Sequence, residues 1–79
     1  MDLSKFIENK GLTETEIKVL NYILDNIDEV NKLGVRGIAK NNFTSTSTIM
    51  RLSKKLGYTG FLEMQYNLVT LKKVIIVIL

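Results

Sequence analysis

The chain has 79 residues, enough for one small domain and too few for a second. It contains no cysteine and no histidine, which excludes disulfides, Ser-His-Asp and Cys-His nucleophilic sites, and the common zinc, copper and haem ligand sets. No acidic pair stands in a setting suited to acid–base work either, so we expect no enzyme, no metal and no cofactor. The first ten residues lack the apolar run of a signal peptide, which together with the absent cysteines favours the cytoplasm.

Charge is distributed unevenly along the chain. Up to Gly34 there are four basic and seven acidic residues, and after it seven basic and one acidic, so the two halves carry −3 and +6. No acidic residue lies between Glu29 and Glu63. Such asymmetry is typical of a protein that binds a polyanion, and the alternative is a basic face that is merely solvated.

Two helices are predicted in the first half. Residues 2–10 carry Leu3, Phe6 and Ile7 at helical spacing and precede Gly11, which predicts a short amphipathic helix. Thr13 and Glu16 have the spacing of a capping box and predict the start of a second helix. Its apolar stripe is formed by Ile17, Leu20, Ile23, Leu24 and Ile27. We expect an irregular or one-turn segment over residues 28–33, ended by Gly34.

Three more helices are predicted in the second half. Val35, Ile38 and Ala39 indicate a helix of about two turns that ends at the two asparagines 41 and 42. Ser45 is placed as the N-cap of a fourth helix that turns Ile49, Leu52 and Leu56 inward and closes at Gly57. A fifth helix carries Phe61, Met64, Leu68 and Leu71. The predicted fold is therefore all-α, a five-helix bundle, with residues 1–73 as the domain and 74–79 as an apolar tail.

The third and fourth predicted helices, joined by a tight turn, have the arrangement of a helix-turn-helix. Ala39 supplies the small residue where the two helices cross. At 100° per residue, Ser47, Arg51 and Lys54 point away from the core, with Met50 and Lys55 beside them. Arginine can bind guanine with two hydrogen bonds, and capped first-turn amides can bind phosphate. The candidate DNA-binding residues are Arg36, Ser45, Thr46, Ser47, Thr48, Met50, Arg51, Lys54, Lys55 and Tyr58.

For several of these residues a structural role is the alternative: Thr46 and Thr48 as helix-start residues, Lys54 and Lys55 as a solvated face, and Met50 as partly core. The turn also departs from the common pattern, because Phe43 stands where glycine is frequent. Phenylalanine at positive φ is an outlier, so we expect either a left-handed Asn42 or a longer turn. Gly37 is expected to weaken the third helix by about 1 kcal/mol relative to alanine.

The run S-x-x-T-I-x-R-x-x-K-K-L-G-Y-x-G-F over residues 45–61 resembles the N-terminal helix-turn-helix domain of RpiR-type bacterial transcription regulators. Residues 12–16 and 22–26 resemble the opening helix of that family, and the likeness covers about residues 12–71. The resemblance implies a sequence-specific repressor or activator, commonly of sugar or phosphosugar genes, that works as a dimer or tetramer. A sugar-phosphate effector would act only through a following domain that this chain lacks.

The predicted partner is thus an operator in double-stranded DNA. We expect the chain to bind it as a homodimer and not to bind a membrane. Two alternatives stand beside this: a helical module that binds another protein, and an interfacial membrane anchor formed by residues 74–79. Six aliphatic residues are far short of the ~20 that cross a bilayer. We expect the tail to extend the fifth helix into a partner or to pair as a strand.

Overall fold

The computed structural model describes the backbone of residues 11–78 and the side chains up to Leu71. This part of the chain holds four helices and no strand: α2 (Glu14–Asp25), α3 (Ile27–Asn41), α4 (Thr46–Lys55) and α5 (Phe61–Ile78). The all-α class and the helix-turn-helix are confirmed, whereas the count of five helices is not matched. The helix predicted over residues 2–10 lies outside the described residues. Within residues 11–78, none of the helices has the length and apolar character needed to cross a bilayer.

Helix α2 begins at the predicted capping box. The Thr13 side chain accepts from the amide of Glu16 at 3.2 Å, and Glu16 Oε1 accepts from the amide of Thr13 at 2.8 Å. These two bonds satisfy amides that have no acceptor within the helix. The buried stripe, however, is shifted from the predicted one, since Val19 is fully buried and Ile17 only partly.

The segment over residues 28–33 is helical throughout, so it is neither irregular nor limited to the single turn that was the other expectation. Helix α2 ends at Asp25 because Asn26 (φ −126°, ψ 40°) leaves the helical region. The Asn26 carbonyl then accepts from the amides of Glu29 and Val30, which starts α3 without a side-chain cap. Burial of Ile27 and Val30 holds this new helix on the core.

Gly34 breaks α3 as predicted, although the helix resumes immediately after it. Its backbone (φ 69°, ψ 178°) lies in a region that essentially only glycine occupies. The bend explains Gly37 as well, because a Cβ on Gly37 would lie 2.9 Å from the Cβ of Leu33. Gly37 is therefore required by close packing across the bend, which its helix propensity alone does not indicate.

The turn between α3 and α4 differs from both expected solutions. Asn42 (φ −106°) is not left-handed, and Phe43 itself takes positive φ, at 54°. The amide of Phe43 donates to the carbonyl of Lys40 and that of Thr44 to the carbonyl of Ala39. These are the two bonds of a Schellman motif, which requires a left-handed residue at position 43 whatever its type.

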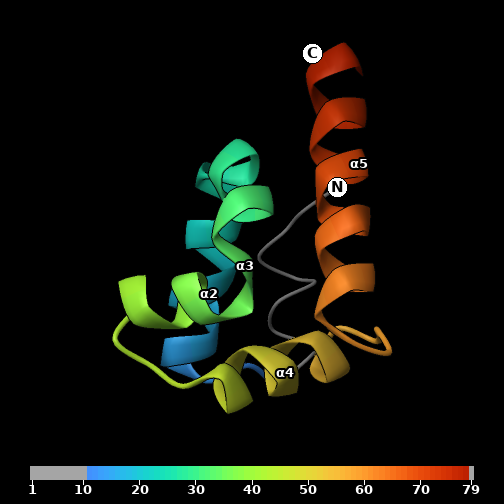
Figure 1. Ribbon diagram of the computed structural model, residues 1–79. Coiled ribbons are helices and arrows are strands. Elements are labelled where there is room, and N and C mark those ends of the chain that lie inside the picture. The colour runs from blue at the N-terminus through green and yellow to red at the C-terminus, as the bar shows by residue number, and fades with distance from the viewer. Residues whose placement is uncertain (1–10, 79) are drawn as a thin grey trace.

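The core lies where the four helices meet. Each helix contributes apolar side chains to it: Val19, Leu20 and Ile23 from α2; Ile27, Val30, Ile38 and Ala39 from α3; Ile49 and Leu52 from α4, with Leu56 at its C-cap; and Phe61, Met64 and Leu68 from α5. Figure 1 shows α2 and α3 on one side, α5 on the other, and α4 lying across the base of the molecule. The last turns of α5, residues 74–78 included, extend beyond the other helices in Figure 1. The backbone of residues 74–78 thus continues the helix and does not form a strand, and the contact of the tail with a partner stays a prediction.

Candidate nucleic-acid interface

One side of α4 is not covered by α2, α3 or α5, and the residues on this side form what we call the outer face of α4. Every one of them is exposed, and together they line a shallow hollow of about 340 Å³: Thr46, Ser47, Met50, Arg51 and Lys54. Helix α4 has no acidic residue in its first turn and two lysines in its last. The structure therefore brings five of the predicted site residues together on one hydrogen-bonding, basic surface.

The opposite side of α4 explains this orientation. Ile49, Leu52 and Leu56 are buried, as predicted from their spacing. Ser53 is also fully buried, and its hydroxyl donates to the carbonyl of Ile49 at 3.0 Å. Because these positions fix the inner side of the helix, the side chains of the outer face must point to solvent.

The N-terminus of α4 is built as predicted. Ser45 has extended backbone (φ −98°, ψ 160°) and its side chain accepts from the amide of Thr48 at 3.3 Å. The Ser45 and Thr48 hydroxyls also lie 3.2 Å apart, so Thr48 is partly engaged in the cap. The remaining first-turn amides have no acceptor within the helix, and with the helix dipole they favour an anion.

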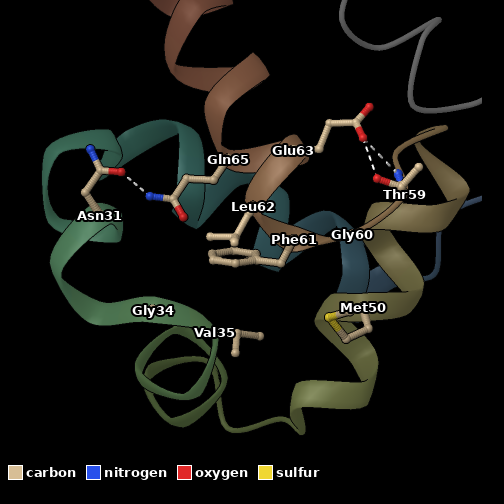
Figure 2. A pocket seen from close by; sticks show the side chains of 10 residues that line it. All are labelled: Asn31, Gly34, Val35, Met50, Thr59, Gly60, Phe61, Leu62, Glu63 and Gln65. Carbon is tan, nitrogen blue, oxygen red and sulfur yellow. Dashed lines mark hydrogen bonds between the residues drawn. The ribbon is translucent and has the colours of Figure 1, made fainter.

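Met50 lies between two hollows. It belongs to the outer face of α4, and it also lines a larger hollow of about 700 Å³ between α3, α4 and α5. Figure 2 shows Met50 across that hollow from Val35, with Phe61 and Leu62 between the helices. Met50 is 38% exposed, so its side chain can contact a ligand at the surface. It also forms part of the apolar wall of the larger hollow.

Lys55 does not join the outer face of α4. Its ammonium lies 2.7 Å from Glu16 Oε1 and 3.3 Å from the carbonyl oxygen of Gly11, so it ties the end of α4 to the start of α2. The Glu16 side chain is fully buried. Burial raises the pKa of this carboxyl, but the bonds from Lys55 and Thr13 outweigh burial and hold the pKa below its usual value.

The other two predicted residues lie apart from α4. Arg36 is exposed on α3, and Lys40 is exposed one turn later. Lys40 is one of the seven basic residues after Gly34, but it was not among the candidate DNA-binding residues. Tyr58 is partly buried against the core, and burial together with Glu63 raises the pKa of its hydroxyl. No group of three or more carboxylates that could hold a metal ion occurs in the described part of the chain.

Comparison with known proteins agrees with this geometry. The family profile described as "Helix-turn-helix domain, rpiR family" matches residues 1–72. The HTH-type transcriptional regulator GlvR of Bacillus subtilis (strain 168) is 36% identical over 52 residues, which cover 66% of this chain and 20% of that protein. The chain thus corresponds to about one fifth of this relative, and no solved structure matches it. The chain belongs to the RpiR family of helix-turn-helix transcription regulators.

Proposed function

We propose that this chain binds double-stranded DNA by placing the outer face of α4 in the major groove. The observation that carries the proposal is that face itself: five exposed side chains, no acidic residue between them, and a capped helix N-terminus at one end. A helix presenting arginine, serine, threonine and methionine can contact base edges and thymine methyl groups. Family membership supports the same function.

The side chains of this face are proposed to do different work. Arg51 lies in the middle of α4 and is exposed, so it is suited to a guanine edge. Lys54 lies in the last turn, where its ammonium suits a phosphate. Thr46 and Ser47, in the first turn, add hydroxyl donors beside the free amides. Arg36 and Lys40 on α3 are proposed to contact the phosphate backbone.

The experiment measures the affinity for an operator, selected from genomic fragments, and for a scrambled duplex at several salt concentrations. Arg51→Ala should lose about 1–3 kcal/mol on the operator and relax the preference at one base pair. Lys54→Ala should weaken both duplexes alike and flatten the log–log salt slope by about one. Asn67→Ala, exposed on α5 and outside the outer face of α4, is the control and should change neither.

Contact with phosphates releases counterions, so the affinity of the wild-type chain for DNA should fall as salt rises. If no salt-dependent binding to either duplex is found, the proposal is wrong. The alternative function, a helical module for another protein, would then stand in its place. If Arg51→Ala weakens both duplexes equally while base preference survives, Arg51 is a phosphate contact and its assignment to a base is wrong.

We further propose that the chain acts as a homodimer through the α5 ridge, defined as Leu62, Tyr66 and Val69. Leu62 and Tyr66 are 79% and 74% exposed, and the three residues lie one helical turn apart. They also border a hollow of about 250 Å³ that is lined by Asn31 and Gln65. A ridge beside a hollow on one face can be self-complementary across a two-fold axis.

Dimerisation would also extend the DNA site, because one helix-turn-helix reads only about 4–6 base pairs. Sedimentation equilibrium of the wild-type chain at ~100 μM should give a dimer mass, and the double variant Leu62→Lys/Tyr66→Lys a monomer mass. Asn67→Lys, exposed on the same helix, is the matched control. A monomeric wild-type chain would contradict this proposal.

The regulated genes are proposed to serve sugar or phosphosugar metabolism, on the strength of the family resemblance. A sugar-phosphate effector would act only through a domain outside this chain. Sequencing of the genomic fragments that the domain selects tests the gene class, and fragments without any sugar-related gene beside them would contradict it.

A further inference from the structure

Phe43 occupies a backbone conformation that disfavours its side chain. Its φ of 54° places it in the left-handed region, where a Cβ comes too close to the following carbonyl oxygen. The Schellman motif that places Phe43 in this region also closes α4, where the amides of Gly57 and Tyr58 donate to the carbonyls of Lys54 and Ser53. There the left-handed position is held by Gly57, at φ 93°, so the chain uses the expected residue at one helix end only.

Packing of the Phe43 side chain does not compensate for this strain. The Phe43 side chain is 98% exposed, the highest value among the large apolar residues that are exposed. It therefore removes almost no apolar surface from water. A strained residue whose side chain contributes nothing to packing suggests that the side chain serves contacts outside the molecule.

The surroundings of Phe43 indicate what those contacts are. Two residues span at most about 7 Å of chain, so Phe43 lies close to the Ser45 cap at the N-terminus of α4. Lys40 and Arg36, both exposed on α3, precede Phe43 by about one and two helical turns. No acidic residue occurs in this half of the chain before Glu63. An exposed aromatic ring next to a helix that carries exposed basic residues is typical of surfaces that bind nucleic acid.

We propose that the Phe43 ring packs on the sugar–phosphate strand whose phosphates the N-terminus of α4 binds. This rests on the proposed DNA binding and adds to it an apolar contact made by the turn. The contact is independent of base sequence, because deoxyribose offers the same apolar edge at every position. It also carries no charge, so it contributes affinity without releasing counterions.

The test uses the whole chain and a mixed-sequence duplex of about 20 base pairs at several salt concentrations. Phe43→Gly should raise Tm by about 3–6 °C because it relieves the strain, while affinity falls about 5-fold at every salt concentration. The salt slope should stay that of the wild type. Phe43→Asn, which also tolerates positive φ, should lose affinity likewise, and Phe43→Tyr should retain it.

The outcomes separate this inference from the function on which it rests. If the wild-type chain shows no salt-dependent binding, the proposed function itself fails. If the wild type binds and both Phe43→Gly and Phe43→Asn bind equally well, the inference fails alone. A lower Tm for Phe43→Gly would contradict the strain, and a flattened salt slope would contradict an uncharged contact.

Discussion

Lys54 and Lys55 are neighbours of the same type, yet the structure gives them different environments. Lys54 is exposed on the outer face of α4, whereas Lys55 binds the fully buried carboxylate of Glu16. Glu16 Oε2 is buried too, and it has no hydrogen-bond partner within the described residues. The charge of this buried carboxylate is balanced by the ammonium of Lys55, and its Oε1 also accepts from the amide of Thr13.

Replacing Lys55 should therefore affect stability first. Lys55→Met is expected to destabilise the fold by about 2–3 kcal/mol, because it leaves a buried charge without its partner. Lys54→Met is the matched control and should stay within about 0.5 kcal/mol of the wild type. Thermal unfolding measures both, and equal stabilities for the two variants would show that the ion pair contributes nothing.

The same pair predicts how stability depends on pH. The folded-state pKa of Glu16 lies below its ordinary value of 4.5, so its contribution is fully present above that pH. It is lost as the pH falls through the lower, folded-state pKa. Chemical unfolding between about pH 6 and pH 2 should show this loss in the wild type and a shallower dependence in Glu16→Gln. Identical pH profiles would contradict the assignment.

At the level of single residues, the sequence was most informative where helical periodicity determines whether a side chain points into the core or to solvent. The inward direction of Ile49 and Leu52 and the outward direction of Arg51 follow from helical spacing, and the structure shows both. The engagement of Lys55 could not be predicted, because Glu16 is 39 residues away and joins it only through tertiary packing. The buried carboxylate itself carries no local signal beyond its place in the capping box.

Helix boundaries were predictable where a side chain or a glycine makes them. Thr13, Ser45 and Gly57 act as predicted, since capping is a local interaction. The end of α2 was missed because Asn26 breaks the helix through its backbone, without glycine or proline. Phe43 was misjudged for the opposite reason: the hydrogen bonds of the turn outweigh the preference of the residue.

The bend in α3 gives a prediction for this element. Gly34→Ala should destabilise the fold by about 1–3 kcal/mol, because alanine does not tolerate φ 69°, ψ 178°. Gly60→Ala is the matched control, since a Cβ there meets nothing within 4 Å and its φ is not positive. Urea unfolding compares the two. If Gly34→Ala is as stable as Gly60→Ala, the bend is not fixed by glycine.

For the whole molecule, the sequence predicted the class and the helix-turn-helix but not how α5 is placed. Phe61, Met64 and Leu68 account for its inner side, and all three are buried. The exposed Leu62 and Tyr66 lie outside that stripe, and no intrachain pattern explains them. The larger hollow beside them also arises only from the meeting of three helices, shown in Figure 2. Such features depend on tertiary geometry, which spacing along one helix does not contain.

Whether DNA lies against the outer face of α4 can be measured by a nuclear magnetic resonance titration of the isotope-labelled chain with duplex DNA. The largest amide shifts should fall on residues 43–54, with smaller ones at Arg36 and Lys40. The amides of Tyr66 and Val69, on α5, should change little. Shifts concentrated on the α5 ridge, with α4 unaffected, would show that DNA does not bind at the outer face of α4.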